Sequence, residues 1–202
     1  FLNVISIFSF IGISLGVAVL IIVMSVMNGF RTELVDRIIG FNAHVVVEPY
    51  FNSINKSKIY NKDLKKISKE LIFTNRGEAI LIHKETTKGL ILKGYTAEDF
   101  LKLNFIKEGN FTGSPKKLLG KSISIGKSLS IDHNLKLGDK VSIMSPIGIQ
   151  TIIGNLPKQE TYIITSIFNS GLDNFDQSVA FINISSLENL FDYDYEKRNL
   201  EI

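Results

Sequence analysis

The chain has 202 residues, a net charge of +3, no cysteine and 45% hydrophobic residues. A disulfide framework is therefore excluded, and the basic excess is too small and too scattered to indicate a nucleic-acid-binding protein. No charged side chain occurs before Arg31. Val4 to Met27 is longer than the roughly 20 apolar residues that a helix needs to cross a bilayer. Because no basic start or small-residue cleavage site marks a signal peptide, we predict an uncleaved transmembrane helix over residues 1–29.

Two features of this helix predict what lies beside it and after it. Gly12 and Gly16 have the GxxxG spacing that lets a second membrane helix approach closely, although glycine is also common in membrane helices that pack otherwise. Apolar residues continue at helical spacing from Phe30 to Ile39, and Gly40 lies where a helix-terminating glycine belongs. We therefore predict that residues 30–40 continue the helix as a rigid stalk.

The residues after the stalk predict a β-α-β-β arrangement. The expected elements, in chain order, are a strand at Ala43–Val47, a helix at Ile59–Leu71, and strands at Glu78–His83 and Lys88–Tyr95. Turn-forming residues from Asn104 to Gly113 then predict a boundary between two lobes. Because the chain lacks an initial Met and Asn199–Ile202 resembles the start of a strand, we expect a fragment of a longer protein.

The second half predicts further strands and short helices. The expected elements are a strand from Ile123, a helix at Lys127–His133, a turn at Leu137–Asp139, strands at Lys140–Met144, Glu160–Phe168 and Ser178–Ile184, and a helix that starts at Ser185. Between two of these strands, Ser145 to Gln159 contains prolines and glycines that should break strands, together with five apolar side chains. Such a loop either folds back on the core or meets a partner, and both alternatives remain open.

No residue pattern predicts catalysis. His44, His83 and His133 lie far apart in the sequence, with no HExxH or CxxC spacing, so we expect surface or strand histidines rather than metal ligands. Asp173 and Asp176 have turn-forming neighbours and are expected to be turn residues. There is no GxxxxGKS or GxSxG motif. We therefore expect a non-catalytic chain that carries no metal and no cofactor of its own.

Two stretches resemble the LolC/LolE family, the permease subunits of the bacterial lipoprotein-releasing ABC transporter. The first is VMNGFRTELVDRIIGFNAHVVV, and the second is IGKSLSIDHNLKLGDKVSIMSPIGIQTIIGNLPKQETYIITSIFNSGLDNFDQSVAFINI. They follow each other in the same order as in the family and with similar spacing. The LGDKV turn alone also fits the wider class of MacB-like permeases, whereas the MNGF run and the Ser-Pro loop point to this family within that class.

The resemblance implies an α+β fold of the MacB-like periplasmic core type. One N-terminal transmembrane helix and its stalk would lead into a two-lobed periplasmic domain, and three further membrane helices of the whole subunit would lie outside this chain. The implied segments are a porter-like lobe over 41–118, a Sabre-like lobe over 119–183 with a hook loop at 146–162, and an incomplete return to the porter-like lobe over 184–202.

The resemblance also implies an inner-membrane transport subunit whose role is mechanical. Its partners would be a cytoplasmic LolD-like ATPase that binds ATP and magnesium, a second permease, lipoprotein substrates and the periplasmic carrier LolA. In a LolC-type subunit the hook holds LolA. The expected carrier contacts are therefore the hook residues Pro146, Ile149, Ile152, Ile153, Leu156 and Pro157.

Other readings of the same anchor and stalk remain open. A MacB-type efflux permease would carry a nucleotide-binding domain on the same chain before this helix. An FtsX-type regulator of cell-wall hydrolases would lack the loop at Ser145–Gln159. A sensor or adhesin would have no further apolar spans. The residues fit LolC-like, LolE-like and fused forms equally.

Overall fold

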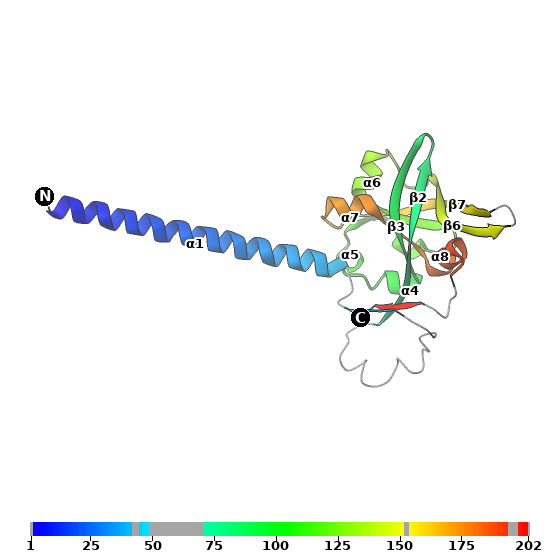
Figure 1. Ribbon diagram of the computed structural model, residues 1–202, viewed down its shortest axis with the longest axis horizontal. Helices are drawn as coiled ribbons and strands as arrows, with labels where there is room; N and C mark the ends of the chain where they lie inside the picture. The colour runs from blue at the N-terminus through cyan, green and yellow to red at the C-terminus, as the bar shows by residue number, and fades with distance from the viewer. Residues whose placement is uncertain (1, 42–44, 49–70, 152–153, 194–197, 202) are drawn as a thin grey trace, which may run out of the picture. The chain divides into compact units, whose positions relative to one another are not determined.

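The computed structural model describes residues 2–41, 45–48, 71–151, 154–193 and 198–201, and the chain divides into two compact units, Phe1–Ile39 and Gly40–Ile202. The first unit is formed by α1 (Leu2–Phe41), which Figure 1 labels. The first proline in the sequence is Pro49, so nothing interrupts the backbone hydrogen bonds of this helix. The predicted continuation beyond the apolar span is confirmed, and the helix ends one residue after Gly40.

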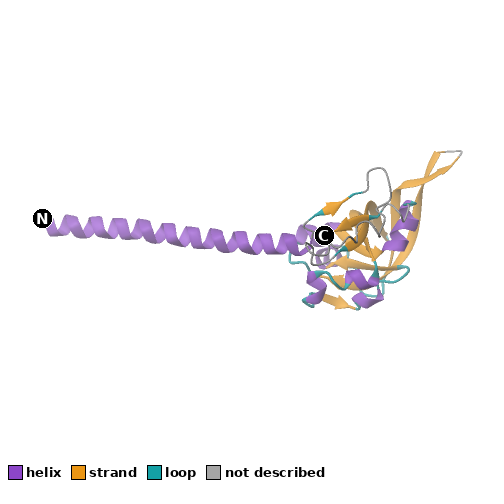
Figure 2. Ribbon diagram, turned by 90° about the horizontal axis from the view of Figure 1, so that it is seen from below, coloured by secondary structure: helices purple, strands orange, loops and turns teal. Residues whose placement is uncertain are grey.

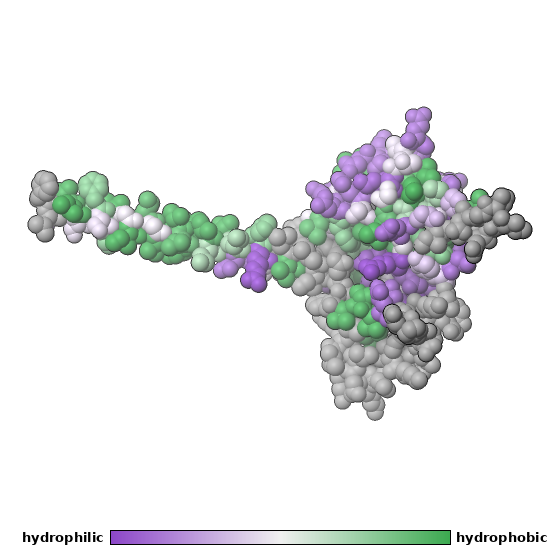
Figure 3. All heavy atoms as spheres, in the orientation of Figure 1, coloured by the Kyte–Doolittle hydropathy of each residue, from purple (hydrophilic) through white to green (hydrophobic). Residues whose placement is uncertain are grey.

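The segment Asn3–Glu33 of α1 is long and apolar enough to cross a membrane, judged by length and composition. Its side chains are exposed, and Figure 3 shows a mostly hydrophobic surface along this part of the helix. An exposed apolar helix of this length is stable in lipid, where every backbone N–H and C=O is already paired within the helix.

The second unit is a mixed α/β structure in which the nine described strands belong to one sheet. The strands are β1 (Val46–Val47), β2 (Ile72–His83), β3 (Thr86–Tyr95), β4 (Phe111–Gly113), β5 (Ser122–Gly126), β6 (Lys140–Thr151), β7 (Gly154–Phe168), β8 (Val179–Asn183) and β9 (Asn199–Glu201). The helices are α4 (Ala97–Phe100), α5 (Asn104–Lys107), the short 3₁₀ helix η1 (Pro115–Lys117), α6 (Lys127–Asp132), α7 (Asp173–Ser178) and α8 (Ile184–Phe191).

Within the described residues, six strands form a closed ring in the order β2-β3-β8-β5-β7-β6, and β6 pairs again with β2. The β3–β8 and β5–β7 pairs are parallel, and the other pairs of the ring are antiparallel. The ring closes through three residue pairs only: Ile80↔Met144, Leu81↔Ile143 and Ile82↔Ser142. Strand β9 extends one end of β2 and bridges it to β1, and β4 lies beside the end of β7.

The core lies on both faces of the sheet, as β8 illustrates. Ala180 and Ile182 belong to a cluster that buries Leu129 of α6 and Leu187 of α8. Phe181 points to the opposite face, into an aromatic cluster. Its ring centroid is 5.0 Å from that of Phe168, 5.3 Å from Phe100 and 5.6 Å from Phe105. A strand buried on both faces explains the continuous apolar run VAFI.

Several predicted boundaries differ from the structure. Strand β2 begins at Ile72 and not at Glu78, as predicted. The strand accommodates polar residues before Glu78, since Thr74 donates a hydrogen bond to the carbonyl of Gly94. The predicted turn region at Asn104–Gly113 is wrong, since it contains α5 and β4. Helix α8 is capped by Asn183, which accepts from the amide of Ser185 at 3.0 Å, and not by Ser185 itself.

Other predictions are confirmed or lie outside what the structure describes. Helix α6 and the strand that follows it occur as expected, and Gly138 supplies the positive φ (+89°) of the turn between them. Apart from Leu71, the expected helix at Ile59–Leu71 lies outside the described residues. The division of the second unit into two lobes stays a prediction.

Candidate functional site

The predicted hook is a continuation of two ring strands. Strands β6 and β7 pair from Lys140↔Ile163 to Thr151↔Gly154, with a shift of register between Ser145 and Ile149. The prediction that prolines and glycines break the strands is therefore wrong. Residues 146–148 of β6 face Pro157 alone, because Ser145 pairs with Lys158 and Ile149 with Leu156. A bulge of this kind absorbs residues that cannot join the ladder and bends the hairpin.

Pro146 separates the hairpin from the ring. The ladder between β2 and β6 stops at Ile80↔Met144, two residues before Pro146. Proline has no N–H to donate, so the ladder cannot continue past it. Beyond this point β6 and β7 pair only with each other among the described strands, and Figure 2 shows the hairpin extending away from the rest of the second unit.

The predicted contact residues gather on this hairpin. Pro146 and Pro157 are exposed, and Leu156 is 56% exposed. The backbone of Ile149 pairs with that of Leu156, but the structure does not describe the side chain of Ile149. Ile152 and Ile153 lie outside the described residues. The structure thus brings the described members of the predicted set together at one projecting end, and their contact with a carrier stays a prediction.

Polar side chains hold the base of the hairpin to α8. Lys158 Nζ donates to the backbone carbonyl of Asn189 and, at 2.9 Å, to its Oδ1. Asn189 Nδ2 donates to Glu160 at 3.4 Å, and the Tyr162 hydroxyl donates to the same carboxylate at 3.2 Å. Burial and the neighbouring carboxylate raise the pKa of the Tyr162 hydroxyl, which stays protonated and keeps donating. No sequence signal identified this set, because α8 and β7 are distant in the chain.

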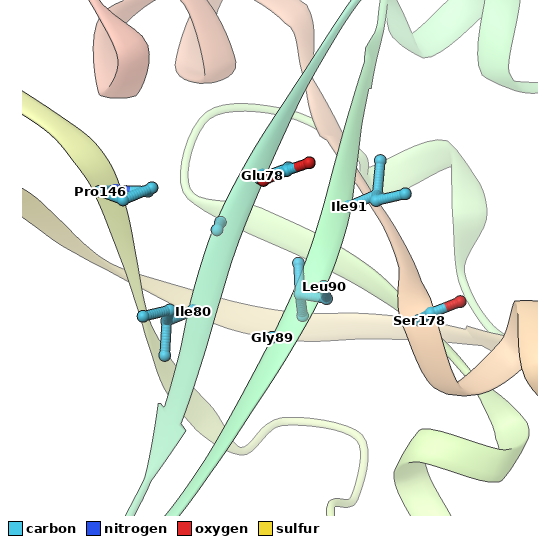
Figure 4. Close-up of a pocket in the computed structure, with 8 residues that line it drawn as sticks. Glu78, Ile80, Gly89, Leu90, Ile91, Pro146 and Ser178 are labelled. Atoms are coloured by element: carbon cyan, nitrogen blue, oxygen red, sulfur yellow. The ribbon is translucent and has the colours of Figure 1, made fainter.

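An apolar groove of about 410 Å³ lies beside the base of the hairpin (Figure 4). Its wall includes Pro146, and its floor is formed by β2 and β3, where Ile80 faces Gly89. The groove is open at Gly89 because this residue has no side chain, and no described atom lies within 4 Å of where its Cβ would be. Glu78 contributes a carboxylate, so the groove is apolar with one acidic side chain.

The other candidate residues do not join this site. The face of α1 that carries Gly12 and Gly16 is open, because no described atom lies within 4 Å of a Cβ built at either position. His83 Nδ1 lies 3.1 Å from the carbonyl of Lys140, and His44 lies outside the described residues. His133 belongs to the turn after α6, and its buried Nδ1 has no hydrogen-bond partner among the described residues. In the part of the chain that the structure describes, no three His, Asp or Glu side chains are grouped as metal ligands would be.

Asp173 and Asp176 are predicted to be turn residues, and this prediction is wrong, because both belong to α7. Asp176 is buried, and its two carboxylate oxygens accept from the amide of Ser170 at 3.0 and 3.2 Å. Burial raises the pKa of Asp176, against the opposing effect of these hydrogen bonds. Asp173 accepts from the Ser128 hydroxyl of α6 at 3.0 Å. Each carboxylate therefore has a structural partner of its own.

Comparison with known proteins identifies relatives along nearly the whole chain. The family model of the MacB-like periplasmic core domain matches residues 6–200. The lipoprotein-releasing system transmembrane protein LolC of Xylella fastidiosa (strain Temecula1) is 24% identical over 206 residues, which cover 96% of this chain and 48% of that protein. The corresponding LolE of Haemophilus influenzae is 34% identical over 134 residues, which cover 58% of this chain and 31% of that protein.

The same comparison finds a solved structure, the periplasmic region of MacB from Actinobacillus actinomycetemcomitans. It is 13% identical, with a TM-score of 0.44, and the match covers 84% of this chain and 79% of that chain. This chain spans about half the length of the curated relatives that match nearly all of it.

Proposed function

Since this chain belongs to the family of MacB-like periplasmic core domains, we propose that it is part of an inner-membrane permease subunit of an ABC transporter that releases lipoproteins to a periplasmic carrier. The curated relatives named LolC and LolE support the lipoprotein-releasing branch of the superfamily. Helix α1 would be the first membrane span, and the second unit would lie in the periplasm.

The observation that carries the proposal is the hairpin of β6 and β7. It leaves the ring at Pro146 and presents Leu156 and Pro157 to solvent. An isolated projecting hairpin contributes little to the core, so exposed apolar side chains on it are better explained by a partner. A few such apolar anchors usually supply most of the binding energy of an interface. The partner that we propose is the LolA-type carrier.

The proposed mechanism is mechanical. A separate LolD-like ATPase would bind ATP with magnesium and hydrolyse it, and a second permease would complete the membrane cavity that accepts the lipid anchor of the substrate. This chain would form one wall of that cavity with α1 and present the hook to the carrier. Its part requires no catalytic residue and no cofactor, since it transmits movement and holds a partner.

The test is photo-crosslinking in membranes that contain the full transporter. A crosslinking residue at Leu156 should capture the carrier, whereas one at Lys136, which is exposed just before the start of β6, should not. Capture at Leu156 alone would support a LolC-like hook. If an assembled transporter captures the carrier at neither position, the hook assignment fails, and a LolE-like, MacB-like or FtsX-like role becomes the better explanation.

A further inference from the structure

Helix α8 contacts two segments that are distant from each other in the sequence. One side of the helix carries Asn189, which meets the base of the hairpin at Lys158 and Glu160. The adjacent residue, Glu188, meets Arg198 next to β9 and Asn75 of β2. Two consecutive residues of one short helix therefore join the hairpin to β2 and to the segment before β9.

The Glu188 contacts fix α8 in place. Arg198 donates to the two carboxylate oxygens of Glu188 at 2.5 and 2.8 Å, and Asn75 Nδ2 donates at 3.3 Å. Glu188 is buried, so these charge-assisted bonds are shielded from water. Phe191 of the same helix packs on Gly77 so closely that a Cβ there would be 2.5 Å from the ring. The helix is thus a rigid part of the second unit.

The hairpin, in contrast, has little else to hold it. Its pairing with β2 ends at Met144, and its two strands separate from the ring at the bulge that follows Ser145. A hairpin of two strands is flexible and only marginally stable by itself. Lys158 lies at the first residue pair before the bulge, opposite Ser145. The bonds to Asn189 therefore act where the hairpin would bend.

We propose that Asn189 is a positioning residue that sets the direction in which the hook leaves the ring. Its backbone carbonyl and its side-chain Oδ1 accept from Lys158, while its Nδ2 donates to Glu160, so this residue holds two side chains on the same face of β7. This inference rests on the proposed function, because the hook is the part of the molecule that α8 would aim at a partner.

The inference is tested with spin labels on the full chain in lipid nanodiscs. The sequence has no cysteine, so labels at Leu156→Cys and Lys127→Cys report only the distance between the hook and the ring. The variant Asn189→Ala should broaden the distribution of this distance, and Lys158→Met should do the same. Since the loss of one or two hydrogen bonds changes a population ratio by about fivefold, the main distance should lose its dominance.

A matched control separates positioning from general loss of structure. Asn110 is also exposed and also donates through Nδ2 to a glutamate, Glu108, at 3.1 Å. Asn110→Ala should leave the distance distribution unchanged, while the melting temperatures of both variants should stay close to that of the original chain. Asn189→Asp keeps the acceptor for Lys158 but replaces the donor to Glu160 with a second carboxylate, so it should also broaden the distribution. An unchanged distribution in Asn189→Ala would overturn the inference.

The carrier assay distinguishes this inference from the proposed function. In the full transporter, Asn189→Ala should lower carrier capture at Leu156 by about fivefold, in line with the smaller population of the correct direction. If the unaltered chain captures no carrier, the proposed function fails. The distance measurement contains no carrier and would still decide whether Asn189 positions the hairpin.

Discussion

Gly126 lies at the end of β5, and the need for a glycine at this position is explained by a contact with a residue distant in the sequence. A Cβ at this position would be 2.1 Å from the carbonyl oxygen of Asp176 and 2.5 Å from its Cα. Because these are backbone atoms, the clash cannot be relieved by a side-chain rotation. We expect Gly126→Ala to destabilise the fold by about 2–4 kcal/mol, measured as a lower urea midpoint.

Gly89→Ala provides the control for this prediction. Gly89 is also a strand glycine, but the space where its Cβ would lie is open. The exchange should therefore change stability by less than about 0.5 kcal/mol or raise it slightly, since alanine has less backbone freedom to lose. Equal midpoints for the two alanine variants would contradict the proposed contact between β5 and α7.

The raised pKa of Asp176 predicts that the stability of the fold depends on pH. Its folded-state pKa is raised above the ordinary 3.8 by burial, so folding favours the protonated form. This contribution is present in full below the ordinary pKa and is lost as the pH rises through the raised value. Asp176→Asn keeps an oxygen for the Ser170 amide but does not titrate.

The difference between the original chain and Asp176→Asn isolates this group from the other carboxylates. Relative to the variant, the original chain should gain stability as the pH falls through the acidic range. Urea midpoints of both chains, measured at several acidic pH values, test this expectation. Parallel curves would show that Asp176 titrates as it does in the unfolded chain.

The sequence could not have predicted the roles of these residues. The IGKS run correctly indicates a strand followed by a helix, as β5 and α6 show. Nothing local to it indicates that Asp176 lies against Gly126, because the contact joins β5 and α7, which are separated in the chain by α6, β6 and β7. Asp176 itself has turn-forming neighbours, and only burial distinguishes it from a solvated turn residue.

At the level of elements, the contact between α8 and the segment before β9 depends on one ion pair. The side chains of Glu188 and Arg198 are 9% and 21% exposed. Arg198→Met would leave a buried carboxylate with Asn75 as its remaining described partner and should lower the free energy of unfolding by roughly 1–3 kcal/mol. The double variant Glu188→Met/Arg198→Met also removes the buried carboxylate, so it should be less destabilised than Arg198→Met alone.

Urea unfolding of the full chain in detergent, with both single variants and the double variant, gives the coupling energy. A double variant whose loss equals the sum of the two single losses would show that the pair contributes no interaction of its own.

Helix α1 allows a prediction about its packing in lipid. If Gly12 and Gly16 let a second helix approach, then Gly12→Leu together with Gly16→Leu should reduce the amount of the proposed second permease that purifies with this chain. Gly29→Leu changes a glycine of the same helix that stands outside this spacing, and it should have little effect. Equal recovery of the partner from both variants would contradict packing through the GxxxG face.

The elements show where sequence patterns succeed. Hydrophobic length predicted α1, and alternation or apolar runs predicted the cores of β3, β5 and β8. Of β6 and β7, only the projecting part at Ser145–Gln159 is predicted to be a loop, because proline and glycine normally end strands. In the structure the bulge opposite Pro157 absorbs them, which depends on the pairing of the two strands and not on the local sequence of either.

At the scale of the second unit, ring closure predicts a gradient of hydrogen exchange. Amides of β8 and β5 lie in strands paired on both sides and should exchange only when the whole unit unfolds. Amides of β6 beyond Pro146 are paired on one side only, so they should exchange many times faster. Mass spectrometry of deuterated peptides from the full chain distinguishes these classes, and equal protection would contradict a hairpin that stands apart from the ring.

The pairing of strands in the ring also determines the order in which the second unit can fold during synthesis. β3 must wait for β8, since Ile91 pairs with Val179, and β2 must wait for β6 and β9. Pairing across such long intervals of sequence is slow. The β2–β3 hairpin is therefore synthesised early with Leu81, Leu90 and Leu92 uncovered, and its neighbours β6, β8 and β9 are synthesised only after β4 and β5. During that interval the nascent protein is at its most prone to aggregation, and it is the stage at which a chaperone would matter most.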